Sequence, residues 1–334
     1  MLLDGLHVPL TVPFHRDGRL FAAKLEANVA RFSKTPAAGL IVLGPGSEAN
    51  GLTDAESGEV LAAVARAAAH EKVLIAGVSR DSVRASLEAA QVAFDTGFDA
   101  VLAESPHQLQ GDSAEEAMVY FRALADASPL PVVVGSGFGS RALPVEWVAE
   151  LARHANLIGM VDADLIPARF AEIAAATASV KREVEVTAVF AAVTRRMRAA
   201  GSGLVTLGQG TAQPMLKTRT KSVGFQVLAA GSTDMLPVLR AGASGAAPVL
   251  AACAPQACYE VYAAWKDGDD ALAAQKADRI LVASQLLAEE LGVAGVKYGC
   301  DLNGYYGGAP RLPRLPLNAA GRERVEAALR EIPS

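Results

Sequence analysis

Residues 39–56 read GLIVLGPGSEANGLTDAE, which is a run of apolar positions, a glycine-rich turn and the start of a helix. Apolar side chains at consecutive positions are typical of a strand that is buried on both faces of a parallel sheet. Thr53 stands before Asp54 and Glu56 in the pattern of a helix N-cap. The stretch therefore predicts one strand–turn–helix unit, and this unit recurs along the chain.

The recurring unit predicts eight strands separated by helices. The predicted strands are Val8–Thr11, Gly39–Leu43, Val73–Val78, Ala100–Ala103, Pro131–Val134, Leu157–Val161, Phe225–Ala229 and Ala243–Val249. Eight strands alternating with helices favour a (β/α)8 TIM barrel, in which active sites lie at the C-terminal ends of the strands. A doubly wound sheet is the alternative, but it usually needs fewer strands and a different glycine-rich fingerprint loop.

The composition predicts a soluble α/β protein. Of the 334 residues, 51% are apolar and 20% are charged, which is enough to bury a full core. A net charge of −5 and an aromatic content of 5% argue against binding to nucleic acid or membrane surfaces. Three cysteines, with no apolar leader and no membrane-length apolar run, lead us to expect a cytoplasmic protein.

Two segments depart from the repeat. Helical patterns after the last strand predict a C-terminal helical region over 253–334, following a barrel over 1–252. Residues 179–223 form an insertion where a barrel usually spends about 2–6 residues. Eight basic side chains in 181–221 are opposed only by Glu183 and Glu185. We expect a solvated extension or oligomer contact at the N-terminal face of the barrel, and an anion or partner site is the alternative.

A series of short motifs carries a resemblance to a known family. Gly44-Pro-Gly-Ser-Glu48 follows the second strand, Pro106 follows the fourth, and Asn156-Leu-Ile-Gly-Met160 precedes the end of the sixth. The motifs Thr11–Phe14, Leu130–Val134, Gly242–Gly245, Val296-Lys297 and Pro310-Arg311 complete the series. In this order they resemble the dihydrodipicolinate synthase and N-acetylneuraminate lyase family over nearly the whole chain. The resemblance implies a (β/α)8 barrel assembled as a homo-oligomer, a dimer or tetramer.

The resemblance also implies a chemistry that this chain has lost. Members of the family are lyases and aldolases acting on pyruvate or other 2-oxo acids, and a lysine on the sixth strand forms a Schiff base with the ketone. A tyrosine ending the fifth strand relays protons, and a Gly-Thr-Thr loop holds the substrate carboxylate. Here the lysine position is Val161, the tyrosine position is Gly135, and Pro45 and Gly46 replace the threonines. We therefore expect no imine at Val161 and no synthesis of dihydrodipicolinate.

Polar residues after the strands are the remaining catalytic candidates. His107 is a candidate general base, and Glu104 and Asp162 are candidates beside it. With Asp164 these three residues could hold a divalent metal that acts as a Lewis acid, but structural roles, such as a helix cap by Asp164, are the favoured alternative. We predict neither a metal nor a cofactor.

The glycine turns are candidates for recognition of a carboxylate. Gly44–Ser47 and the turn that starts at Gly135 offer main-chain N–H groups near helix starts, which suits an anion. The predicted substrate-binding residues are Gly44, Gly46, Ser47, Gly135, Ser136 and Val161. Tight turns without a ligand are the alternative.

Two functions stay open at this point. The chain is either a lyase or aldolase-type enzyme that acts on a small 2-oxo acid without a lysine Schiff base, or a non-catalytic homologue. The homologue would bind a small carboxylic acid or serve as a partner subunit.

Overall fold

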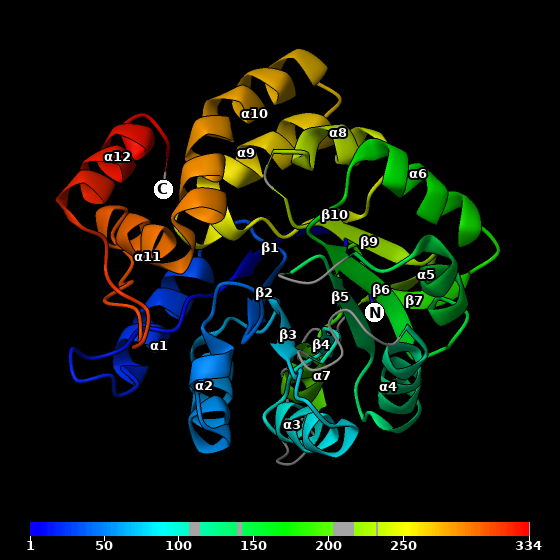
Figure 1. The fold of residues 1–334 in the computed structure, drawn as a ribbon. Coiled ribbons are helices and arrows are strands. Elements are labelled where there is room, and N and C mark those ends of the chain that lie inside the picture. The colour runs from blue at the N-terminus through cyan, green and yellow to red at the C-terminus, as the bar shows by residue number, and fades with distance from the viewer. Residues whose placement is uncertain (107–113, 139–141, 203–216, 232, 334) are drawn as a thin grey trace, which may run out of the picture.

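The computed structural model describes residues 1–106, 114–138, 142–202, 217–231 and 233–333. Within them, eight parallel strands close into a barrel in the order β1-β2-β3-β4-β5-β6-β9-β10, with β10 beside β1 (Figure 1). The strands are β1 (Gly5–Pro9), β2 (Gly39–Val42), β3 (Val73–Gly77), β4 (Ala100–Ala103), β5 (Val132–Ser136), β6 (Leu157–Asp162), β9 (Gln226–Ala229) and β10 (Gly245–Ala246). The predicted (β/α)8 barrel is confirmed, and each predicted strand overlaps an observed one.

Helices cover the outside of the barrel (Figure 1). They are α1 (Ala22–Phe32), α2 (Asp54–Ala67), α3 (Val83–Asp95), α4 (Ala114–Ala127), α5 (Val145–Leu151), α6 (Pro167–Ala176), α8 (Met235–Arg240) and α9 (Pro255–Lys266). Thr53 and Glu56 form a capping box at the start of α2, and Ser82 caps α3, so local sequence fixes both helix starts. The last of these helices, α9, packs against β1 and α8 as the eighth barrel helix, although the predicted limit at residue 252 assigned it to the C-terminal region.

Three further helices follow the barrel. They are α10 (Asp270–Ser284), which continues into a π-helical turn over Gln285–Glu290, α11 (Gly292–Leu302) and α12 (Ala319–Leu329). Figure 1 shows them grouped on one side of the barrel, with α10 beside α9. Of the helices in the described residues, none is both long enough and apolar enough to cross a membrane.

Apolar side chains form two layers around the barrel wall. One cluster fills the barrel interior and includes Ile75, Leu102, Val133, Val161 and Leu228. The other lies between the strands and the helices and includes residues such as Val101 and Val134, because neighbouring residues on a strand point to opposite faces. The side chains of the first cluster fill the interior, as is usual for a barrel of eight strands. Full burial of a valine, leucine or isoleucine side chain stabilises the fold by about 1.5–3 kcal/mol.

The insertion forms a small unit of its own. It contains β7 (Arg182–Thr187), α7 (Arg195–Ser202) and β8 (Thr218–Val223), and the two strands pair in an antiparallel hairpin. Arg196 donates to carbonyls at the end of α2, Arg195 to carbonyls at the end of α3, and Arg182 to carbonyls at the end of α5.

These three contacts place the insertion against the N-terminal face of the barrel, where the barrel helices end. The last carbonyls of a helix lack partners within the helix and carry a partial negative charge, so they attract cations. Three of the eight basic side chains in this segment therefore cap barrel helices.

Candidate functional site

Val161 lies in the barrel wall with its side chain directed inward. It pairs in register with Gly135 of β5 and Leu228 of β9, it is 1% exposed, and it belongs to the interior cluster. The preceding residue, Met160, belongs to the outer cluster, as strand alternation requires. At this position the barrel interior is therefore lined by hydrocarbon.

Gly135 gives space to Glu104. A Cβ atom built on Gly135 would lie 2.5 Å from Cγ of Glu104, so any larger residue there would collide with the glutamate. The register of β4 and β5 pairs Ala103 with Val134, which puts the next residues, Glu104 and Gly135, side by side. We call Glu104, Gly135 and Val161 the inward row, because they are neighbours across β4, β5 and β6.

The Glu104 carboxyl is largely removed from water. Burial raises its pKa to about 7, because removal of water disfavours the charged form. Its main-chain N–H donates to Oγ of Ser79 at 2.9 Å, which fixes the start of the side chain. At neutral pH the carboxyl therefore exists in both protonation states, as a general acid–base group requires.

Asp162 is turned away from the barrel interior. Its side chain is fully buried, and Arg169 of α6 donates to Oδ2 at 2.8 Å. The N–H of Asp164 donates to Oδ1 at 2.9 Å. Burial raises the pKa of Asp162, and the charge of Arg169 acts in the opposite direction. The carboxylate thus fastens the turn after β6 to α6, and this arrangement does not support the predicted catalytic role of Asp162.

Of the four residues considered as possible metal ligands, Glu104, Asp162 and Asp164 lie in the part of the chain that the structure describes. There, no group of three or more His, Cys, Asp or Glu side chains is placed to hold a metal ion. Asp164 does not cap α6, because that helix begins at Pro167 after Ile166 and has no side-chain cap. His107 lies outside the described residues.

The glycine turn after β2 is held by its own serine. Ser47 is fully buried, and its hydroxyl donates to the carbonyl of Gly44 at 2.6 Å. The N–H of Ala49 donates back to the same hydroxyl at 3.3 Å. Gly46 has a φ of 78°, a conformation that glycine adopts without strain. The Ser47 hydroxyl is therefore committed to the turn, and Gly44 and Gly46 are left to present main chain.

Ser136 also has a structural contact. Its hydroxyl is buried and accepts a hydrogen bond from the N–H of Leu143 at 3.1 Å. The side chain follows Gly135 on β5, so by alternation it faces the helices and not the interior. Of the predicted substrate-binding residues, Gly135 and Val161 are therefore the two that belong to the inward row.

Glu48 links the barrel to the C-terminal helices. Nζ of Lys297 in α11 lies 2.5 Å from Oε2 of Glu48, and both side chains are buried. The N–H of Arg311 donates to Oε1 of Glu48 at 2.8 Å, and its guanidinium pairs with Glu56. Both cations stack on the ring of Phe14, at 4.4 and 4.3 Å from its centroid. This network fixes the turn after β2 in position.

The structure describes every lysine of the chain. The nine are Lys24, Lys34, Lys72, Lys181, Lys217, Lys221, Lys266, Lys276 and Lys297. Only Lys72 and Lys297 are buried. Lys72 donates to the carbonyls of Thr35 and Ala37, near the start of β2 and β3, and Lys297 pairs with Glu48. The other seven lie on outer helices, loops and the insertion, so their amines are outside the cluster around Val161.

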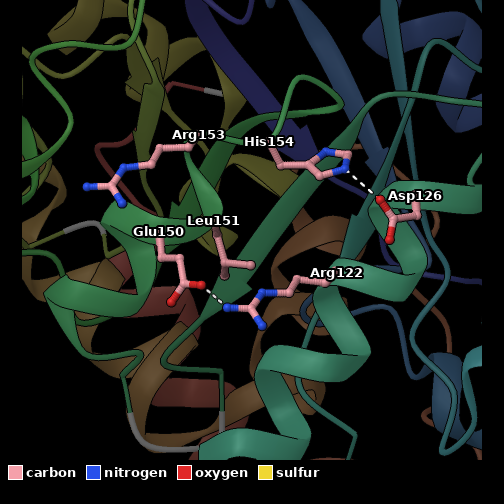
Figure 2. Close-up of a pocket in the computed structure, with 6 residues that line it drawn as sticks. All are labelled: Arg122, Asp126, Glu150, Leu151, Arg153 and His154. Atoms are coloured by element: carbon pink, nitrogen blue, oxygen red, sulfur yellow. Dashed lines mark hydrogen bonds and ion pairs between the residues drawn. The ribbon is translucent and has the colours of Figure 1, made fainter.

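A surface cavity of about 420 Å³ lies between α4 and α5 (Figure 2). Its charged side chains are largely paired with one another. Arg122 pairs with Glu150, and Nε2 of His154 lies 3.0 Å from Oδ1 of Asp126. The cavity adjoins the ends of the two helices, at the opposite end of the barrel from the turns after the strands. It is therefore separate from the inward row.

The contact between Glu104 and Gly135 escaped the sequence analysis. A glycine at the end of one strand and a carboxylate at the end of its neighbour were both visible in the sequence. Counting the alternation from Leu102 and Val133 would have directed both residues inward. The missing information was the register of the two strands.

Comparison with known proteins identifies relatives over nearly the whole chain. The model of the dihydrodipicolinate synthetase family matches residues 2–178 and 193–332, and the unmatched residues 179–192 belong to the insertion. A 4-hydroxy-tetrahydrodipicolinate synthase of Acidiphilium cryptum is 26% identical over 331 residues, or 98% of either chain. An L-threo-3-deoxy-hexylosonate aldolase of Hypocrea jecorina is 25% identical over 336 residues, which cover 98% of this chain and 95% of the aldolase.

Solved structures share the fold. A dihydrodipicolinate synthase from Bacillus anthracis superposes over the full length of both chains with a TM-score of 0.80 at 21% identity. A prophage protein of the dihydrodipicolinic acid synthase family from E. coli K12, solved in complex with pyruvate, has a TM-score of 0.78 at 21% identity over 99% of either chain.

Proposed function

The chain belongs to the dihydrodipicolinate synthetase family, and from this premise we propose that it is a lyase or aldolase-type enzyme that acts on a small 2-oxo acid without a lysine Schiff base. The reaction class is supported by the relatives, which include synthases and an aldolase. The substrate class is supported by the family member that was solved with pyruvate.

Val161 is the observation that carries this proposal. An imine forms only when a primary amine reaches the carbonyl carbon, and the side chain of Val161 is a buried hydrocarbon that faces the barrel interior. The two buried lysines support the same reading, because Lys72 and Lys297 are held by other partners. The positions of the other seven lysines, on outer helices, loops and the insertion, support it too.

Without an imine, the ketone oxygen has to take up the charge that develops when a bond at the neighbouring carbon is made or broken. In an apolar site, a hydrogen-bond donor at that oxygen stabilises the enolate far more than it would in water. We propose that the main chain of Gly44 and Gly46 contributes to binding the substrate carboxylate. The Ser47 hydroxyl holds that turn in shape.

The competing function is a non-catalytic homologue that binds a small carboxylic acid or acts as a partner subunit. This alternative is supported by Ser47, Ser136 and Asp162, whose polar side chains all form hydrogen bonds within the protein.

The two functions separate in an assay with pyruvate and a panel of other 2-oxo acids, with and without aldehydes. The proposed function predicts turnover that survives treatment with sodium borohydride in the presence of substrate, because no imine is there to be reduced. A relative that uses a Schiff base serves as the control and should lose its activity. Binding of a 2-oxo acid without turnover would establish the non-catalytic function, and loss of turnover with borohydride would overturn the proposed mechanism.

A further inference from the structure

We propose that Glu104 is the catalytic acid–base residue of this site and that it protonates the ketone oxygen of the bound 2-oxo acid. The inference rests on the proposed function and deepens it by naming the group that replaces the imine. Its basis is the position of Glu104 in the inward row, where Gly135 leaves space for its side chain and Val161 is the next neighbour.

The contacts of the other buried carboxyls distinguish Glu104 from a structural residue. Asp162 is paired with Arg169, and Glu48 is paired with Lys297. Asp99 accepts hydrogen bonds from the N–H groups of Leu74 and Arg195. Among the residues that the structure describes, no donor holds the Glu104 side chain.

A buried carboxyl without a hydrogen-bond partner destabilises a fold. A buried carboxyl with a raised pKa is a candidate for proton transfer, because both of its protonation states are accessible near neutral pH.

The charged groups around Glu104 leave both of its protonation states accessible. The charge of Glu104 contributes to raising the pKa of Tyr120 in α4, and the hydroxyl of Tyr120 is hydrogen-bonded to Ser86. The guanidinium of Arg80, after β3, is turned toward Asp54 at 3.0 Å and toward the carbonyl of Ser79. With no cation directed at the carboxyl from these elements, burial dominates and its pKa rises to about 7.

The proposed step is enolisation of the 2-oxo acid. A proton leaves the carbon beside the ketone and passes to water, and its electron pair forms the carbon–carbon double bond. The electron pair of the carbonyl moves onto oxygen, which takes the proton from the Glu104 carboxyl. The reverse step returns that proton to Glu104 and takes a new one from water onto carbon. A neutral carboxylic acid in an apolar site is a suitable donor for this oxygen.

Exchange of the methyl protons of pyruvate for deuterium in D2O, followed by proton NMR, tests this step directly. We expect wild-type protein to catalyse exchange with a rate that falls as the pH rises above about 7, because the acid form is lost. Glu104→Gln should reduce the rate by about 10²–10⁴-fold and abolish that pH dependence. Glu115→Gln, which changes an exposed carboxylate on α4, is the matched control and should keep the wild-type rate and profile.

The outcomes separate this inference from the function on which it rests. Exchange at the wild-type rate in the Glu104→Gln variant would overturn the role of Glu104 and leave the proposed function standing. No exchange by the wild-type protein with pyruvate or any other enolisable 2-oxo acid would overturn both. Circular dichroism and binding of pyruvate to the Glu104→Gln variant establish that a loss of exchange is not a loss of fold or of substrate.

Discussion

Replacement of Glu104 by glutamine should stabilise the protein at neutral and alkaline pH. In the folded state burial raises the carboxyl pKa from 4.5 to about 7, whereas in the unfolded chain it keeps its ordinary value. Between these values the unfolded chain releases a proton that the folded protein retains, so wild-type stability falls as the pH rises from about 4.5 to 7. The full difference corresponds to about 3 kcal/mol, which is an upper bound because the side chain keeps some exposure.

Urea unfolding at pH 5 and at pH 8 measures this effect. Glutamine is uncharged at both values and similar in size, so any cost of burying its amide is the same at both. The free energy of unfolding of Glu104→Gln minus that of wild type should therefore rise by up to about 3 kcal/mol between pH 5 and pH 8. A difference that stays constant, or falls with pH as it would for a paired structural carboxylate, would refute the reasoning.

Four further predictions test the inward row and other buried contacts of the structure. Gly135→Ala should displace the Glu104 side chain and slow pyruvate exchange, with little change in the affinity for pyruvate. Gly58→Ala within α2 is the control and should leave the exchange rate unchanged. Equal exchange rates for the two variants would contradict the packing of Glu104 against Gly135. Burial lowers the pKa of His7 from 6.5 to about 4, so about 3 kcal/mol of stability should be lost as the pH falls from 6.5 to 4. The free energies of unfolding of wild type and His7→Gln, measured with urea, should therefore diverge over that range. Parallel pH dependences would exclude a lowered pKa for His7. Arg196→Ala removes the guanidinium that donates to the carbonyls of Ala68 and Lys72. It should lower the free energy of unfolding by about 2–3 kcal/mol and leave the rate of pyruvate exchange at the wild-type value. A change in the exchange rate without a change in stability would contradict a structural role. Val161→Lys directs an amine into the barrel, and borohydride with pyruvate should then label that lysine; failure to label a folded variant would argue against an inward-facing site.

The fold was predictable because parallel barrel strands are buried on both sides. Runs such as Gly39–Leu43 and Val73–Val78 are apolar at consecutive positions, and each coincides closely with an observed strand. The predicted first strand, Val8–Thr11, begins and ends later than β1 (Gly5–Pro9), because the apolar pattern continues past the end of the strand.

The site was less predictable because its contacts depend on register and on main-chain groups. Strand alternation alone predicts that Asp162 points outward once Val161 points inward. Its partner Arg169 lies seven residues further on, in the first turn of α6, and the sequence does not mark this pairing. The basic side chains of the insertion bind carbonyls at helix ends, and no side-chain pattern in the sequence marks these partners. In β7, buried and exposed residues alternate, and this alternation in the sequence is typical of a half-buried strand.

The central claim is that the protein handles a 2-oxo acid without an imine, and intact-mass spectrometry after sodium borohydride reduction in the presence of pyruvate tests it most directly. The wild-type protein should keep its unmodified mass, while a Schiff-base relative treated in parallel gains a reduced pyruvyl group. A pyruvyl adduct on any of the nine lysines of the wild-type chain would contradict the account.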